Sequence, residues 1–311
     1  MNKAFIYILL GASLWGTIGW YVKNLYSYGF TPMEVVTLRV SSAAFLLIIY
    51  LAMTAPKKLK LTSFRDIGFF IGTGIFSIVF FNFCLFTAID MSTIPTATAL
   101  LYTGPAFVTI LSFLLFKESL TKPKIVALIV TLAGVALVVG LVPLNLSTFE
   151  LSSVLFGLGS GFGYALYSIF SKFALKKYTS LSVTLFTFVV AALFLLPFFP
   201  YEEKMHLLMD PLVLFYAVGL GFLPTAFAYI IYTYGLNLTE ASFASILTTV
   251  EPVVAALIGI FLFQEPFTIV QMTGMACIIG AVIFIQVFPE NTPKKIALSD
   301  VHHDTRVKNH L

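Results

Sequence analysis

Residues 241–263 read ASFASILTTVEPVVAALIGIFLF, an apolar run interrupted near its middle by Glu251 and Pro252. A helix that crosses the hydrocarbon core of a bilayer, about 30 Å thick, needs about 20 predominantly apolar residues. This run meets that length, and it is apolar on all sides rather than at alternate residues, which favours a helix over a barrel strand. The stretch therefore predicts a transmembrane helix that carries a carboxyl group and a helix breaker at mid-depth.

The rest of the chain has the same composition. Of its 311 residues, 59% are hydrophobic and 10% are charged, whereas a soluble domain has about 25% charged residues. The mean hydropathy is +0.99. These values exclude a soluble globular protein and a disordered one. Cys84 and Cys277 lie in apolar runs, which excludes a disulfide framework and a cysteine-rich metal site. The composition predicts an integral membrane protein.

Ten segments are long and apolar enough to be membrane spans. They are residues 4–22, 32–53, 67–89, 94–116, 125–142, 153–173, 181–199, 211–236, 241–263 and 267–287. The connections are short, so no room remains for a soluble catalytic domain. Residues 289–311 are polar and lack an apolar period, which predicts a disordered tail.

The basic residues predict the orientation of these spans. Cytoplasmic loops of membrane proteins carry an excess of Lys and Arg. With the N-terminus inside, all but three of the 18 Lys and Arg residues fall on the cytoplasmic side. Lys23 and Lys204 fall outside, and Arg39 lies within a span. We therefore expect both termini, and the tail, to be cytoplasmic.

The sequence also repeats at a spacing of 147 residues. Matching pairs are Gly72 with Gly219, Gly74 with Gly221, Pro105 with Pro252 and Glu118 with Glu265. The repeat predicts two five-helix units, residues 1–145 and 146–288, and an odd number of spans inverts the second unit. Inverted repeats with helix breakers near the midplane are typical of transporters. A duplicated scaffold without transport is the alternative, and a channel is disfavoured because no filter loop or ring of charge is present.

Together these features resemble EamA-type members of the drug/metabolite transporter superfamily. The resemblance depends on Leu14-Trp15-Gly16 followed by Lys23, on Arg39, on the apolar half-helices that follow Pro105 and Pro252 and end in Glu118 and Glu265, and on the duplication. It implies a ten-helix bundle, with a central cavity between the halves, that moves a small organic metabolite. The second unit departs from the pattern, with Tyr164-Ala165 in place of a Trp and Thr187 opposite Arg39.

Glu251 is the strongest candidate for a functional residue. An ionised carboxylate at mid-membrane costs a few kcal/mol, so it normally faces a cavity or a partner. Pro252 has no amide to donate and is expected to free the Thr248 carbonyl, which would gather with the Thr248 and Thr249 hydroxyls at the same depth. We expect Glu251 to bind a substrate cation or to carry a coupling proton. The alternative is a protonated packing residue.

The other candidates are aromatic, polar or conformational. The candidates for a cavity lining that attracts a cationic ligand are Trp15, Tyr102, Tyr164, Tyr167, Tyr229 and Tyr232. Packing is the alternative for each. Asn82 is a candidate for the cavity or for contact between helices. Arg39 is expected to be structural, extending to the outer headgroups or pairing with Glu34, and contact with the substrate is the alternative. Pro105, Pro224 and Pro252 are expected to act as hinges.

The predicted function is a secondary transporter that exports amino acids or related amphipathic metabolites from a bacterial cell across the plasma membrane. Coupling would be to protons or by exchange, since no Walker motif is present. No cofactor and no nucleic-acid partner are expected. No metal site is expected either, and this includes the His302-His303 pair. A homodimer is one possible assembly. An uptake permease for a choline-like cation or a nucleoside is the alternative. An intramembrane enzyme is disfavoured, since the spans contain no His.

Overall fold

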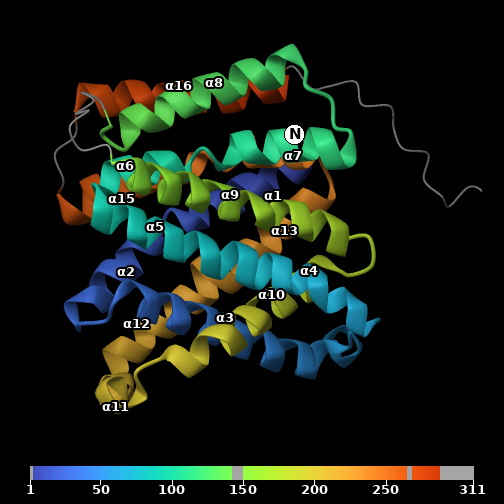
Figure 1. Ribbon diagram of the computed structural model, residues 1–311, viewed down its shortest axis with the longest axis vertical. Helices are drawn as coiled ribbons and strands as arrows, with labels where there is room; N and C mark the ends of the chain where they lie inside the picture. Colours follow the sequence, from blue (N-terminus) through green and yellow to red (C-terminus); the bar gives the residue numbers. More distant parts are fainter. Residues whose placement is uncertain (1–2, 142–149, 265–267, 288–311) are drawn as a thin grey trace, which may run out of the picture.

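The computed structural model describes residues 3–141, 150–264 and 268–287. Within these ranges every regular element is a helix, and nine helices are long and apolar enough to cross a membrane (Figure 1). They are α1–α2 (Lys3–Trp15 and Ile18–Ser27), α3 (Pro32–Thr54), α4–η3–α5 (Ile67–Ile71, Gly72–Val79 and Phe80–Met91), α6–α7 (Ile94–Leu101 and Gly104–Phe116), α9 (Leu151–Ala174), α10–η5 (Ser180–Leu195 and Leu196–Phe198), α12–η7–α13 (Pro211–Gly221, Phe222–Phe227 and Ala228–Asn237), α14–α15 (Ala241–Leu247 and Val250–Phe263) and α16 (Ile269–Val287). The prediction of a helical membrane protein is confirmed.

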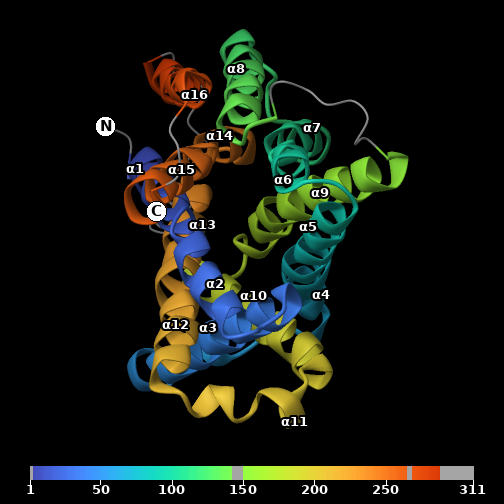
Figure 2. The same ribbon diagram turned by 90° about the vertical axis from the view of Figure 1, so that its left-hand side faces the viewer.

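The tenth predicted span, residues 125–142, contains helix α8 (Lys122–Val138), whose 17 residues make it shorter than the nine. It packs along α16 at one edge of the bundle (Figures 1 and 2). Gly134 and Gly274 permit this approach, because a Cβ atom at Gly134 would lie 2.8 Å from the Gly274 carbonyl oxygen. Residue 142 and the predicted tail lie outside the described residues, so the count of ten spans stays a prediction.

Two spans break into half-helices where the sequence places proline. The α6–α7 span is interrupted at Tyr102 and Thr103, and Pro105 lies in the first turn of α7. The α14–α15 span is interrupted after Leu247, and Pro252 lies in the first turn of α15. Proline is tolerated in a first turn because the amide it lacks has no intrahelical acceptor there. These two prolines therefore mark helix breaks, and their action as hinges stays a prediction.

Two other spans change from α-helical to π-helical winding. The π-helical segments are η3 and η7, and Pro224 lies within η7. Each packs closely against a neighbouring span at a glycine within it or directly before it. A Cβ atom at Gly74 of η3 would lie 2.7 Å from the Thr187 carbonyl oxygen of α10. One at Gly221, the last residue of α12 before η7, would lie 2.4 Å from the Ser42 Cβ of α3. Turns of π-helix occur often at functional sites. The residues beside η3 and η7 are therefore candidates for functional residues.

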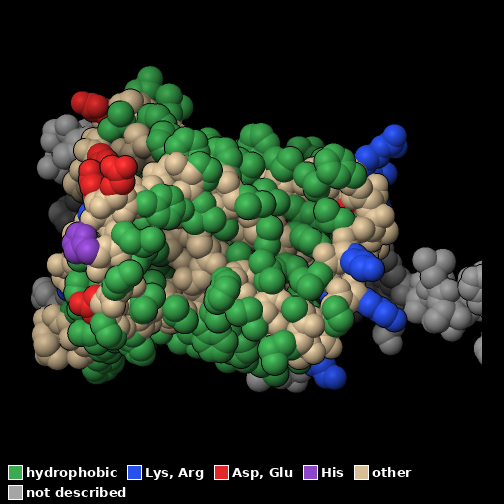
Figure 3. All heavy atoms as spheres, turned by 90° about the horizontal axis from the view of Figure 1, so that it is seen from below, with side chains coloured by type: hydrophobic (Ala, Val, Ile, Leu, Met, Phe, Trp, Pro, Cys, Tyr) green, Lys and Arg blue, Asp and Glu red, His purple; other side chains and the backbone are tan. Residues whose placement is uncertain are grey.

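The surface has an apolar band between two ends of different charge. Lys and Arg gather at one end, whereas Asp, Glu and His gather at the other (Figure 3). The basic end carries the loop that follows α3, with Lys57, Lys58 and Lys60, and the acidic end carries the short helix α11 (Tyr201–Lys204). Such a band bounded by charge is the surface expected of a protein that crosses a bilayer.

Candidate functional site

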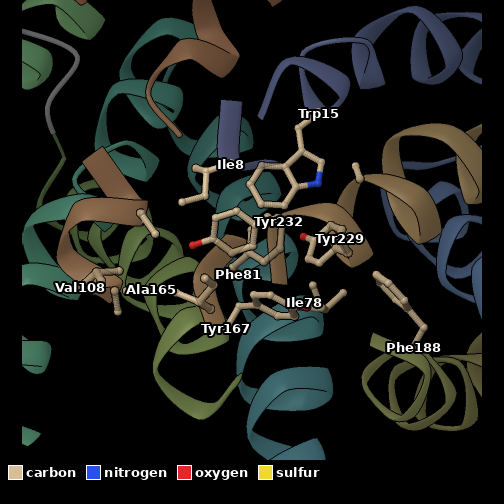
Figure 4. Packing of buried hydrophobic residues seen from close by; sticks show 14 of the residues in the cluster. Ile8, Trp15, Ile78, Phe81, Val108, Ala165, Tyr167, Phe188, Tyr229 and Tyr232 are labelled. Carbon is tan, nitrogen blue, oxygen red and sulfur yellow. The ribbon is translucent and has the colours of Figure 1, made fainter. Parts of the chain in front are cut away.

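A cluster of aromatic side chains lies at the centre of the bundle (Figure 4). We call Trp15, Tyr164, Tyr167, Tyr229 and Tyr232 the central aromatic cluster. The Trp15 ring centroid lies 4.8 Å from that of Tyr229, 4.9 Å from that of Tyr232 and 6.3 Å from that of Tyr164. Three of the predicted lining residues on α9 and α13 therefore surround Trp15 of α1.

The close packing of α1 on α13 brings these rings together. Gly11 has no side chain where α13 approaches, since a Cβ atom there would lie 3.0 Å from the Ala228 carbonyl oxygen. Gly235 has the same role further along α13, because a Cβ atom there would lie 2.7 Å from the Ile8 side chain. Only residues without a side chain allow such backbone contact within a membrane bundle.

The cluster encloses a cavity that is almost filled. Ser77, Phe81 and Ser168 complete its lining. The free volume is about 10 Å³, which is room for about one water molecule. The resemblance implies a central cavity between the halves, and the aromatic rings leave little free space in the cavity that they enclose.

Four polar atoms around this centre have no hydrogen-bond partner in the described part of the chain. They are Trp15 Nε1, the hydroxyls of Ser77 and Tyr164, and Glu251 Oε2, and all four atoms are buried. More than 90% of buried polar groups are hydrogen-bonded, and leaving one without a partner costs about 1–3 kcal/mol. Four such atoms at one centre make it a candidate for a binding site.

Glu251 reaches this centre from the first turn of α15. The Glu251 carbonyl oxygen would lie 2.9 Å from a Cβ atom at Gly16, so the end of α1 rests directly on the start of α15. The Glu251 carboxyl lies within electrostatic range of Tyr102, Tyr164 and Arg39. The Tyr102 and Tyr164 hydroxyls approach the carboxyl without completing a hydrogen bond to Oε2.

The repeat partner of Glu251 explains why the site has one carboxyl and not two. Gly104 occupies the equivalent position, and a Cβ atom there would lie 2.8 Å from Cδ1 of Tyr164. The tyrosine ring therefore fills the space that a second glutamate would need. The centre is asymmetric in charge although the sequence repeats.

The prediction that Pro252 frees the Thr248 carbonyl is wrong. Because the helix breaks at this point, that carbonyl accepts instead from the Glu251 amide, at 2.9 Å. The Thr248 hydroxyl donates to the Ser245 carbonyl at 2.7 Å, and the Thr249 hydroxyl donates to the Ile246 carbonyl at 2.6 Å. These groups are satisfied locally.

The predicted partners of Arg39, the outer headgroups or Glu34, are also wrong. Arg39 is 7% exposed and its Nε donates to the Thr225 hydroxyl of η7 at 2.8 Å. Its guanidinium carbon lies 5.9 Å from the Tyr229 ring centroid. Glu34 instead accepts from the Thr31 amide at 2.9 Å and lies 3.7 Å from Lys204. Arg39 thus points to the centre and not to the headgroups.

Thr187, the residue opposite Arg39 in the repeat, makes the matching contact with the other π-helical segment. Its hydroxyl lies 2.6 Å from the Thr73 hydroxyl of η3. Each π-helical segment is therefore held by a polar side chain from the span beside it. The sequence contained this signal, because Arg39 and Thr187 stand at equivalent repeat positions, but their partners could not be read from it.

The two remaining candidates, Tyr102 and Asn82, lie in different surroundings. Tyr102 lies at the α6–α7 break, beside Glu251. Asn82 does not line the cavity: its amide nitrogen donates to the Ile78 carbonyl at 2.7 Å, within its own helix. Sequence reasoning missed Ser168, whose hydroxyl lies 2.7 Å from that of Tyr232. It could have been found from its position four residues after Tyr164, on the same helix face.

The described ranges contain no group of three or more His, Cys, Asp or Glu side chains that could hold a metal ion. His302 and His303 lie outside those ranges.

The fold and the site together define a multi-pass membrane protein with a cluster of aromatic and polar side chains at the centre of its helical bundle. The EamA-like transporter family model matches residues 2–140 and 151–287, and the chain belongs to that family. A protein of Archaeoglobus fulgidus named an uncharacterized transporter is 30% identical over 89% of this chain and 93% of its own length. The uncharacterized transporter YetK of Bacillus subtilis is 28% identical over 71% of this chain and 67% of its own.

A solved crystal structure shares the fold. Its TM-score is 0.73 at 18% identity, and the match covers 92% of this chain and 96% of the solved one. The relatives are named transporters and come from bacteria and archaea. The chain is accordingly a multi-pass transporter of the plasma membrane.

Proposed function

We propose that this chain is a secondary transporter that exports an amino acid or a related amphipathic metabolite by alternating access. The observation that carries the proposal is an acid and a base, Glu251 with its buried Oε2 atom and the buried Arg39, beside an aromatic cluster with polar atoms that have no partner among the described residues. A zwitterion supplies the complementary pair, an ammonium for the carboxylate and a carboxylate for the guanidinium. Its apolar side chain would pack on the rings.

An organic cation is the second candidate substrate, and uptake is then the alternative direction. Aromatic rings around a carboxylate attract a quaternary ammonium by up to about 2 kcal/mol once water is excluded. Arg39 argues against this candidate. Its guanidinium lies beside the Tyr229 ring and would repel a cation that carries no negative charge.

The proposed architecture is ten spans in two inverted five-helix repeats, residues 1–145 and 146–288, with both termini in the cytoplasm. The two ranges matched by the family model support this division. So does the recurrence of a broken span and a π-helical span in each half. The basic end of the molecule would face the cytoplasm.

Contacts at the basic end support a conformation closed toward the cytoplasm. Glu118, at the end of α7, accepts from the Ala241 amide at 2.7 Å, the Ser242 amide at 3.0 Å and the Ser242 hydroxyl at 2.5 Å. Lys124 pairs with Glu240, and Lys172 donates to the Thr239 carbonyl. These bonds fasten the start of the span that carries Glu251, and we infer that they must break for the centre to open inward.

Cysteine labelling tests the orientation. With Cys84 and Cys277 replaced by Ala, a Glu203→Cys variant should react with an impermeant maleimide in intact cells, because Glu203 is exposed at the acidic end. A Lys58→Cys variant, exposed at the basic end, should react only after the cells are opened. The reverse pattern would contradict the proposed topology.

A ligand screen by thermal unfolding of the purified protein tests the substrate class. A ligand that binds only the folded state at 100 times its Kd stabilises by about 2.7 kcal/mol. We expect amino acids to raise the unfolding temperature, and quaternary amines, nucleosides and sugars to raise it less. A Trp15→Ala variant should lose the response. Stabilisation by quaternary amines alone would replace the proposed substrate with the second candidate.

A further inference from the structure

A large groove opens on the outside of the bundle at its basic end, away from the central cluster. Its volume is about 1090 Å³, whereas pockets for small molecules usually measure about 300–1,000 Å³. Its walls come from the second half of α3 and from η7 and α13, and the turn between α9 and α10 closes its basic end. We call it the lysine groove.

The two ends of the lysine groove differ in chemistry. Along the apolar band it is lined by exposed hydrophobic side chains, including Tyr50, 53% exposed, Met53, 81% exposed, and Phe222, 54% exposed. At the basic end it is lined by Lys58, Lys176 and Lys177. An occupant must therefore be apolar along most of its length and anionic at one end.

Two of these lysines are available to an anion. Lys177 pairs with Asp66 at 2.7 Å. Lys58 and Lys176 are exposed and form no ion pair within the described ranges, although the Lys176 ammonium lies 5.2 Å from the Phe173 ring centroid. These two ammonium groups lie at the basic end of an apolar groove. This arrangement matches the chemistry of an anionic lipid.

A second groove, at the other end of the molecule, provides an internal comparison. It measures about 670 Å³ and is lined by residues of α3, of the η3–α5 region and of the end of α10. Those positions correspond to the walls of the lysine groove at the repeat spacing of 147 residues. Its lining contains Glu34 and no Lys or Arg. The fold thus builds an apolar groove twice, and the basic rim belongs to one copy.

We propose that the lysine groove binds an anionic phospholipid, with the phosphate held by Lys58 and Lys176 and the acyl chains lying between α3 and α13. The site is separate from the central aromatic cluster and does not depend on the proposed substrate. A neutral lipid satisfies the apolar walls but leaves the lysines without a counter-charge. The bound lipid would cover α3 and η7, the two elements joined by the Arg39–Thr225 hydrogen bond.

Native mass spectrometry of the purified full-length protein in detergent tests the site. Phosphatidylglycerol and phosphatidylethanolamine with the same acyl chains are added at equal concentrations. We expect one molecule of phosphatidylglycerol to be retained in preference. Since one lysine near an anionic headgroup contributes about fivefold in affinity, a Lys58→Gln/Lys176→Gln variant should bind phosphatidylglycerol about 25-fold more weakly. This variant leaves the Lys177–Asp66 pair intact.

The matched control removes two exposed lysines of the same end that do not line the groove, in a Lys117→Gln/Lys122→Gln variant. It should bind phosphatidylglycerol as the unmodified protein does, and millimolar glycerol phosphate should not displace the lipid. Equal losses in both variants would overturn the proposal in favour of diffuse surface charge. Equal retention of the two lipids by the unmodified protein would overturn it, and so would displacement by glycerol phosphate, which would indicate a phosphate site without a lipid groove.

Discussion

Replacement of Glu251 by Gln is expected to abolish transport and leave the fold intact. The variant keeps the size and the hydrogen-bonding capacity of the side chain and removes its charge and its proton. A contact between a charged group and its partner contributes about 1.5–3 kcal/mol, so binding of an amino acid should weaken by about 10-fold to 100-fold. The loss is measured as uptake of a radiolabelled amino acid into proteoliposomes, with thermal unfolding as the check on folding.

The same variant separates two roles of Glu251. If the carboxyl carries the coupling proton, transport by the unmodified protein responds to a pH gradient and the Glu251→Gln variant shows no such response. Glu202→Gln is the matched control, because Glu202 is exposed in α11 at the acidic end. Transport by the Glu251→Gln variant at the normal rate, with an unchanged pH profile, would make Glu251 a packing residue.

Replacement of Arg39 by Gln is expected to change which ligands bind. In the proposed site Arg39 meets the carboxylate of a zwitterion, so its loss should weaken binding of the amino acid by about 10-fold to 100-fold. Binding of the corresponding amine, which has no carboxylate, should change much less. The measurement is the ratio of the two Kd values by calorimetry, for the unmodified protein and for the variant.

Two controls make the Arg39 result specific. Arg39→Gln also removes the donor to Thr225 and leaves Glu251 without the nearby cation, so some loss of thermal stability is expected. Thr187→Val removes the equivalent contact with Thr73 and should leave the ratio of Kd values unchanged. An unchanged ratio in the Arg39→Gln variant would return Arg39 to a structural role.

The helical spans and their breaks could be predicted from the sequence because they depend on local properties. Hydrophobic length places a span in the membrane, and Pro105 and Pro252 each lie in the first turn after a helix break. Trp15 and Tyr164 were singled out by their repeat positions, and their rings lie beside each other. Their role in binding stays a prediction.

The partners of the polar side chains could not be predicted, because they depend on how the helices pack. Arg39 reaches Thr225 only because the π-helical segment η7 lies against α3. The sequence of η7 contains no pattern that predicts π-helical geometry. Asn82 is bonded within its own turn, a local alternative that any mid-helix amide has. The aromatic rings fill most of the space that they enclose because of how the helices pack, so periodicity and spacing carry no information about the free volume.

Fluorescence of Trp15 tests the central claim most directly, namely that the substrate binds in the central aromatic cluster. The chain has two tryptophans, so a Trp20→Phe variant leaves Trp15 as the single reporter. The Trp15 indole nitrogen is buried and has no hydrogen-bond partner among the described residues. Addition of an amino acid that stabilises the protein should shift the Trp15 emission saturably, with the Kd found by calorimetry, and a further Glu251→Gln substitution should remove the shift. An amino acid that is transported and stabilises the protein, yet leaves the Trp15 emission unchanged at saturation, would place the binding site elsewhere and contradict the account.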